Sequence, residues 1–193
     1  MIEYINRQGR IYYLNEGKTK TGKPKYFFSM KLPEKPVSVI PDGFEIYENP
    51  NSQVFLRKIP LQIITPEEME IVVSGLKKHS KLDYFIVDVK GKNIVIYTCD
   101  QDIDPLVEIA SSTYGADSPK VKNAIARSLS YTAMMQFVLE DIKTREFVVE
   151  RWCFRGSVDD WIPLVDSLNL EELVRKYTSH LGKESFYDLM PYY

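Results

Sequence analysis

Apolar positions along the chain change their spacing from one region to the next, and this change separates predicted strands from predicted helices. Between residues 11 and 58, aromatic and β-branched residues are interrupted by turn sequences such as "IPDGF" (40–44), and no helical period is present. Such a pattern is typical of short strands joined by tight turns. It predicts an antiparallel β meander, with 11–16 and 26–31 as neighbouring strands.

The stretch "TPEEMEIVVSGLKKH" (65–79) has the spacing of a helix with one buried stripe. Thr65 is the expected N-cap, Pro66 suits the first helical position, and Glu68 completes a capping box. The predicted stripe consists of Met69, Val72, Val73 and Leu76. This helix follows the β-rich region and marks a boundary.

Two further hairpins and three further helices are predicted beyond this boundary. The hairpins cover 83–99, around Gly91, and 133–154, and the helices begin near Pro105, Ser118 and Asn169. Strands and helices therefore come in blocks, without strict alternation. We predict an α+β fold with mainly antiparallel sheet, in which an N-terminal β meander is followed by helices and two further hairpins.

The domain organisation has two alternatives. Residues 1–62 form a β-rich N-terminal part with a basic hairpin loop, and residues 63–193 form an α+β C-terminal part. One continuous domain is the other alternative, because no flexible linker separates the two parts.

The composition excludes several classes of protein. Of the 193 residues, 44% are hydrophobic and 27% are charged, which excludes a disordered chain. The N-terminal residues lack the apolar core of a signal peptide, and no apolar run approaches the roughly 20 residues of a membrane span. Cys99 and Cys153 are expected to be reduced thiols. We therefore predict a cytoplasmic protein without contact to a membrane.

Charge is distributed unevenly, and the excess of lysine lies in one loop. Residues 1–35 hold eight Lys and Arg against three Glu, while the whole chain has a net charge of −2. The stretch "GKTKTGKPKYFF" (17–28) places lysines beside aromatic residues, which are the components of sequence-tolerant nucleic-acid binding. The predicted nucleic-acid-binding residues are Lys18, Lys20, Lys23 and Lys25. The alternative is a solvated hairpin whose lysines keep a strand edge unpaired.

Three longer stretches resemble conserved bacterial proteins of unknown function. These are "GKTKTGKPKYFFS", "IPDGFEIYENPNSQVFLRK" and "QFVLEDIKTREFVVERWCFRGSVDDWI". The resemblance covers most of the chain and implies a bacterial protein, with no assigned chemistry.

Two groups of acidic residues offer an alternative metal-dependent chemistry. Asp100, Asp102 and Asp104 alternate after a predicted strand and could gather a divalent cation, although Asp104 also suits a helix N-cap. Asp88 and Lys90 resemble half of the PD-(D/E)xK nuclease motif, with the carboxylate as metal ligand and the lysine activating water. The motif needs another acidic residue at an earlier strand, and Asp83 lies too near to serve.

The segment "ERWCFRGSVDDW" (150–161) is a candidate protein interface. Arginine and tryptophan are enriched at interface hot spots, and the predicted protein-binding residues are Arg151, Arg155 and Trp161. Ser157 and Asp160 are spaced to cap a helical turn. The alternative is a buried Trp152, with Arg155 paired to a neighbouring aspartate.

The leading hypothesis is a non-enzymatic binding module that contacts nucleic acid through the lysine loop or a protein through the Trp/Arg segment. The alternative is a metal-dependent hydrolase, most simply a nuclease. No Gly-rich nucleotide loop is present, so no cofactor is predicted. His79 and His180 are expected at helix ends, where a cation is favourable.

Overall fold

The protein consists of two compact units. A computed structural model describes residues 1–99, 101, 103–114, 118–155, 158–165 and 167–190. The first unit comprises residues 1–60 and 101–130, and the second comprises 61–100 and 131–193. The described helices and mostly antiparallel strands confirm the predicted α+β class. The first break lies within a few residues of the predicted boundary, whereas 101–130 groups with the N-terminal strands.

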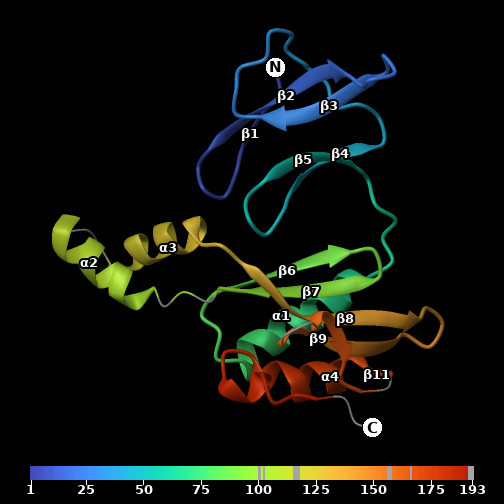
Figure 1. Ribbon diagram of the computed structural model, residues 1–193, viewed down its shortest axis with the longest axis vertical. Coiled ribbons are helices and arrows are strands. Elements are labelled where there is room, and N and C mark those ends of the chain that lie inside the picture. The colour runs from blue at the N-terminus through green and yellow to red at the C-terminus, as the bar shows by residue number, and fades with distance from the viewer. Residues whose placement is uncertain (100, 102, 115–117, 156–157, 166, 191–193) are drawn as a thin grey trace. The chain divides into compact units, whose positions relative to one another are not determined.

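The strands of the first unit form two small antiparallel sheets (Figure 1). A three-stranded sheet has the order β1-β2-β3, and a separate hairpin joins β4 and β5. The bounds are β1 (Glu3–Ile5), β2 (Ile11–Lys18), β3 (Pro24–Ser29), β4 (Phe44–Glu48) and β5 (Val54–Lys58).

The predicted meander is interrupted between β3 and β4. Residues 30–43 contain Pro33, Pro36 and Pro41, which lack the N–H group that a sheet ladder needs. The segment instead crosses back to the first strands, where the N–H of Ile2 donates to the carbonyl of Val37 at 2.8 Å. The two sheets therefore arise because this proline-rich segment cannot continue the pairing.

Buried polar groups connect β1 and its turn to the β4–β5 hairpin. Asn6 is 3% exposed, and its side-chain amide donates to the carbonyl of Ser52 at 2.7 Å. The carboxylate of Glu48 accepts from the backbone N–H of Arg7 at 2.9 Å and from the hydroxyl of Tyr4 at 3.1 Å. Burial, followed by the hydrogen bond to Glu48, raises the pKa of Tyr4 above its ordinary value. Polar contacts thus hold this part of the first unit together.

Two helices complete the first unit, α2 (Asp104–Tyr114) and α3 (Ser118–Ser128). Helix α2 begins one residue earlier than predicted, so Asp104 lies within its first turn. The Asp104 carboxylate is 2.8 Å from the ammonium group of Lys122 on α3. Lys122 is the fifth residue of α3, so this pair offsets part of the unfavourable lysine charge near the start of that helix.

The second unit is built on a six-stranded sheet with the strand order β10-β9-β8-β7-β6, and β11 also pairs with β9. All of these pairs are antiparallel, and the predicted hairpins are β6–β7 and β8–β9. The bounds are β6 (Phe85–Lys90), β7 (Asn93–Thr98), β8 (Thr132–Asp141), β9 (Glu146–Arg155), β10 (Val158–Pro163) and β11 (Leu168–Asn169).

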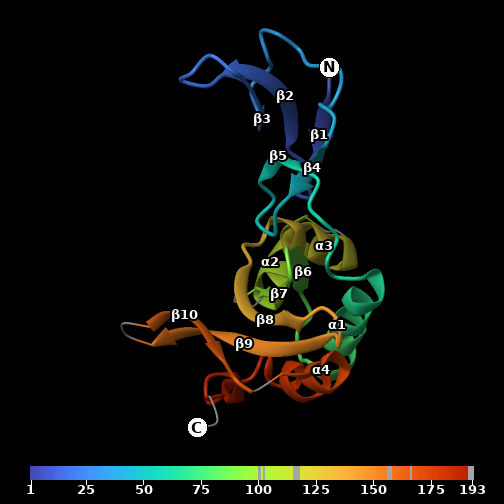
Figure 2. The same ribbon diagram turned by 90° about the vertical axis from the view of Figure 1, so that its right-hand side faces the viewer.

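The predicted helical turn after β9 is wrong, because Asp160 lies in strand β10. Its expected cap, Ser157, lies outside the described residues. The β8–β9 ladder ends at Arg151, whereas the β9–β10 ladder continues to Arg155. Figure 2 shows this two-stranded ribbon extending past β8. Pairing with a strand already in place therefore overrides the local capping pattern.

Helices α1 (Pro66–His79) and α4 (Leu170–Tyr177) cover one face of this sheet (Figures 1 and 2). Two short 3₁₀ turns follow at Thr178–His180 and Glu184–Phe186. The main apolar core lies between the helices and the sheet. It includes Val72, Leu76, Ile94, Ile96, Met135, Phe137, Leu139, Phe147, Val149, Leu173, Val174 and Phe186.

Helix α1 begins with the predicted capping box. The Thr65 hydroxyl accepts from the Glu68 N–H at 3.2 Å, and the Thr65 N–H donates to the Glu68 carboxylate at 2.9 Å. Arg145, in the β8–β9 turn, donates from Nε to the same carboxylate at 2.9 Å. The cap therefore also fixes the helix start to the sheet.

The buried stripe of α1 differs from the prediction at one residue. Val72 and Leu76 are fully buried, and Met69 packs against the core, but Val73 lies outside the core cluster. Gly75 is buried in the stripe, because α4 approaches closely at this point. A Cβ added to Gly75 would lie 2.1 Å from Cγ1 of Val174.

We predict that Gly75→Ala destabilises the protein by about 1–3 kcal/mol, because the added methyl group overpacks the contact with Val174. At an exposed helix position the same change stabilises by up to about 1 kcal/mol. Ser74→Ala, on the exposed side of α1, is the control and should change stability by less than about 0.5 kcal/mol. Chemical denaturation measures both.

In the Gly75→Ala background, Val174→Ala should cost less than in the wild-type protein, since it removes the clashing methyl group. A stabilising Gly75→Ala would contradict the close approach of the two helices.

Candidate functional site

The lysine loop is an ordered hairpin tip that is shorter than predicted. Strand β2 extends to Lys18 and β3 begins at Pro24, which leaves residues 19–23 as the connection. The N–H of Thr19 donates to the carbonyl of Lys23 at 2.8 Å, and the N–H of Lys23 donates to the Thr19 hydroxyl at 3.1 Å. Gly22 has a φ of +82°, which glycine adopts without strain. The tip therefore holds its lysines on a fixed turn.

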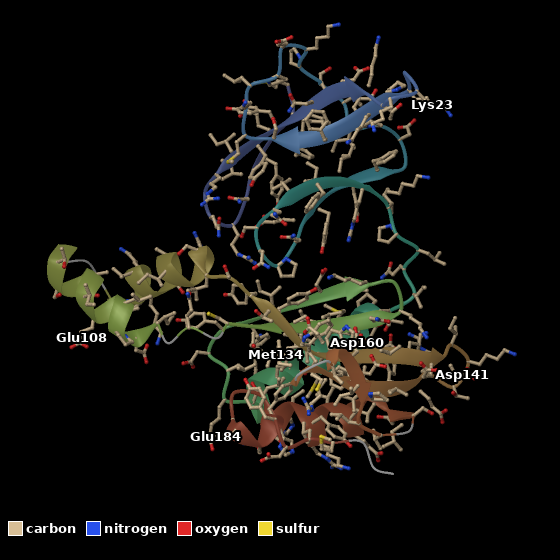
Figure 3. The ribbon with its side chains drawn as sticks, viewed as in Figure 1. Lys23, Glu108, Met134, Asp141, Asp160 and Glu184 are labelled. Atoms are coloured by element: carbon tan, nitrogen blue, oxygen red, sulfur yellow. The ribbon has the colours of Figure 1, made fainter. Side chains whose placement is uncertain are left out.

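The four predicted nucleic-acid-binding lysines, Lys18, Lys20, Lys23 and Lys25, are all exposed. Figure 3 shows Lys23 at the tip of the hairpin. Ion pairs in the described part of the chain join other cations to carboxylates, and these are Arg57, Lys92, Lys122 and Arg145. The loop lysines therefore keep their charge available for an anion.

The aromatic residues of this sheet divide between two faces. Leu14 is fully buried, and alternation places Tyr12 on its face. Phe28 on β3 lies directly opposite Leu14, and Tyr26, two residues before Phe28, lies on the same face. Strand β3 lies against β5. The rings of Tyr12, Tyr26 and Phe28 thus belong to the packed face of the sheet.

The other face of the sheet, which we call the outer face, carries Tyr13, Lys25 and Phe27. Phe27 is 42% exposed. Its ring lies against Gly17, where an added Cβ would be 3.2 Å from Cε1. Lys18 projects to the opposite face, so Lys25 is the strand lysine that lies on the same face as the exposed ring. The outer face therefore combines a cation with an accessible aromatic surface.

Arg151 does not fit its predicted protein-binding role, because it is only 2% exposed. Its guanidinium donates to the carbonyls of Leu189 at 2.6 Å and Trp152 at 3.2 Å. It also lies 5.8 Å from the centre of the Phe186 ring. Main-chain oxygens satisfy this buried cation, which fastens the C-terminal segment to β9.

Trp161 is half-buried and packs edge-on against Trp152 across the β9–β10 ladder. The ring centroids are 5.1 Å apart at an angle of 89°, and the indole N–H of Trp152 donates to the Asp159 carboxylate at 3.0 Å. Phe154, which lies on β9 two residues after Trp152, is 49% exposed. The side chain of Arg155 lies outside the described residues. A protein interface on this ribbon stays a prediction.

We predict that Arg151→Leu releases the C-terminal segment, because the carbonyls of Tyr187 and Leu189 lose their donor. The free energy of unfolding should fall by about 1–3 kcal/mol. Hydrogen exchange of residues 184–190 should become faster. Arg175→Leu, which removes an exposed arginine from α4, is the control. Unchanged exchange in Arg151→Leu would contradict the fastening role.

The residues of the nuclease alternative lie on the edge strand β6. Asp88 and Lys90 share one face, as alternation predicts, and Lys90 donates from Nζ to the Tyr97 hydroxyl. Nearby on that face, Asn93 donates to Gln136 at 3.1 Å and Gln136 donates to Glu150 at 2.6 Å. The lysine thus has a phenol partner, and the neighbouring carboxylate Glu150 already accepts a hydrogen bond. Sequence reasoning did not identify this amide–carboxylate chain.

The metal alternative is only partly covered by the structure. Asp100 and Asp102 lie outside the described residues, while Asp104 forms the ion pair with Lys122. Among the residues that are described, no three His, Cys, Asp or Glu side chains are grouped to hold a metal ion. His180 lies at a helix end, as predicted, and its Nδ1 is 3.0 Å from the Ser185 hydroxyl. Metal-dependent hydrolysis remains a hypothesis.

Comparison with known proteins gives no match, whether to a family model, a curated protein or a solved structure. The resemblance to conserved bacterial proteins therefore stays a prediction. In the described part of the chain, no helix is long and apolar enough to cross a membrane.

Proposed function

We propose that this protein is a binding module that takes up single-stranded nucleic acid on the β2–β3 hairpin and the outer face beside it. The observation that carries the proposal is the position of exposed Phe27 on the same strand face as Lys25, next to a tip with three further lysines. Phosphates would meet the ammonium groups, and a base would stack on the ring.

Electrostatics support the proposal. The four lysines are exposed and are not among the cations that form ion pairs within the described chain. An unpaired cation can release a condensed counterion from a phosphate backbone, which favours binding at low salt. The rest of the chain is acidic overall, so we expect micromolar affinity rather than tight binding.

The exposed ring is what favours a single strand. Lysines at a strand edge also prevent unwanted pairing with other sheets, and this role needs no aromatic surface. Phe27 exposes 42% of its surface beside the lysines, and stacking on such a ring requires an unpaired base. No arginine fork lies in the hairpin, so the proposed binding is independent of sequence.

The hypothesis of a protein partner loses support, because Arg151, one of its three predicted binding residues, is buried. Trp161 and the exposed Phe154 remain on the β9–β10 ribbon, where the carboxylates of Asp159 and Asp160 accept hydrogen bonds from Trp152 and Trp161.

We expect the quadruple variant Lys18→Gln, Lys20→Gln, Lys23→Gln and Lys25→Gln to flatten the slope of log K against log salt by up to about 3. Fluorescence anisotropy with an oligothymidine of about 15 nucleotides measures this slope. The fold should persist, because the changes lie at an exposed tip.

The matched control changes four exposed lysines elsewhere to glutamine, which alters net charge equally. These are Lys77, Lys81, Lys120 and Lys143. The control should retain most of the salt dependence. If the wild-type protein shows no salt-dependent binding at about 50 mM salt, the lysines serve solubility alone.

Phe27→Leu should weaken binding of the single-stranded oligonucleotide by roughly 5- to 100-fold, because a stacked base loses its aromatic partner. Binding of a duplex, which offers no unpaired base, should change little. Phe55→Leu is the control, since Phe55 is 45% exposed in the same unit but lies on β5. Equal losses for both variants would exclude a specific stacking role for Phe27.

A further inference from the structure

Helices α2 and α3 of the first unit form a helix pair with a short connection. They contact each other (Figure 1), and in the sequence only residues 115–117, which include a glycine, separate them. The ion pair of Asp104 and Lys122 joins the two helices. Two helices joined by three or four residues are the plan of the helix-turn-helix motif, whose second helix enters the major groove of DNA. The chain order therefore gives α3 the position of the recognition helix.

The side chains of α3 divide between a covered face and an exposed face. Ala126 and the following Leu129 are 8% and 4% exposed, and the ion pair with Asp104 turns Lys122 toward α2. The exposed positions recur at the helical spacing i, i+3, i+4, i+7 and i+8. They are Lys120, Asn123, Ala124, Arg127 and Ser128. One continuous face of α3 is thus accessible to a partner.

This exposed face carries positive charge without a compensating carboxylate. The sequence of α3 contains three cationic residues and no acidic one, whereas α1 and α4 both begin with acidic residues. Lys120 and Arg127 are not among the cations that form ion pairs within the described chain. Pairs of opposite charge at i and i+4 would stabilise a helix face that serves solubility alone. The charge of α3 therefore favours a polyanion as the partner.

The residue types on the exposed face suit the edges of base pairs. Arginine pairs with guanine and asparagine with adenine through two hydrogen bonds each, and alanine fits beside the methyl group of thymine. Asn123 and Arg127 lie about 6 Å apart along the helix axis, which is close to two base-pair steps. The hydroxyl of Ser128 already donates to the carbonyl of Ile125 at 2.8 Å. Asn123 and Arg127 are therefore the residues that can read a sequence.

Helix α3 ends against an ordered part of the N-terminal sheet. The side-chain amide of Gln8, in the β1–β2 turn, donates to the carbonyl of Ser128 at 3.4 Å. Within this turn, the N–H of Arg10 donates to the side-chain carbonyl of Asn6 at 2.8 Å. Base contacts require side chains that are held within about 0.5 Å, and a supported helix provides this.

We propose that the exposed face of α3 binds duplex DNA in the major groove and reads base pairs with Asn123 and Arg127, with Lys120 beside a phosphate. An α-helix fits this groove, which is about 12 Å wide, whereas the major groove of duplex RNA is too narrow to admit side chains. The site does not depend on the proposed single-strand function, because it uses other residues and bases that stay paired.

Selection from a pool of DNA duplexes tests whether α3 reads bases. The pool carries about 10 randomised base pairs, which is one turn of the double helix, and binding at about 50 mM salt retains weak complexes. The wild-type protein should enrich a motif with adenine and guanine at fixed positions. Asn123→Ala should lose the preference for adenine, and Arg127→Ala should lose the preference for guanine. If the wild-type protein enriches no motif, the proposal is wrong.

Fluorescence anisotropy with the enriched duplex measures the size of each contact. Asn123→Ala and Arg127→Ala should each weaken binding by roughly 5- to 150-fold, because each removes a bidentate base contact. Arg175→Ala, which removes an exposed arginine from α4, is the matched control and should bind like the wild-type protein. Alanine has a higher helix propensity than asparagine, so the denaturation midpoint of Asn123→Ala should not fall. Its loss of binding then has no origin in unfolding.

Two competitors decide how the duplex is bound. A scrambled DNA duplex should bind Asn123→Ala and the wild-type protein equally, and duplex RNA of the enriched sequence should compete poorly. An equal loss on the enriched and scrambled duplexes, or equal competition by the RNA, would overturn base reading in the major groove. Phe27→Leu should retain the enriched motif and Asn123→Ala should retain oligothymidine binding, which distinguishes failure of this site from failure of the single-strand site.

Discussion

The close approach of α1 and α4 is the constraint on which the second unit depends. Both helices must reach the same face of one sheet, and the missing side chain at Gly75 leaves the space that Val174 occupies. Because the helices pack this closely, Val72, Leu76, Leu173 and Val174 all join one core with the central strands. The chain that follows α4 then returns to strand β9, where the guanidinium of Arg151 binds the carbonyls of Tyr187 and Leu189.

The two units are stabilised by different interactions. The second has a continuous apolar core, whereas β1 and the β4–β5 hairpin of the first are joined by hydrogen bonds of Asn6, Arg7 and Glu48. A small sheet with a limited core can leave apolar side chains such as Ile5 and Phe27 on its outer face. The surface that we propose for nucleic acid is a consequence of this architecture, because a second layer over the outer face would cover the ring.

The cations of the chain show why residue type alone does not define a binding site. Arg151 and the loop lysines all lie in stretches that also contain aromatic residues. Arg151 points into the protein and binds main-chain oxygens, while the lysines remain exposed on a hairpin tip. Strand alternation decides which face of a sheet a side chain lies on, and the segments packed against that face decide whether it is buried. Because the C-terminal segment covers Arg151, this arginine holds the fold together and does not fit the predicted binding role.

The sequence by itself determined the elements whose signals are local. The capping box at Thr65 and Glu68, the hairpin around Gly91 and the exposed lysine tip were all predictable, because each depends on residues within one turn or one ladder. Tertiary structure alone decided the rest. It placed Asp160 in a strand, buried Arg151, separated β4–β5 from the first sheet and grouped residues 101–130 with the N-terminal strands. These outcomes depend on which distant segments lie against a residue, and no local pattern encodes that contact.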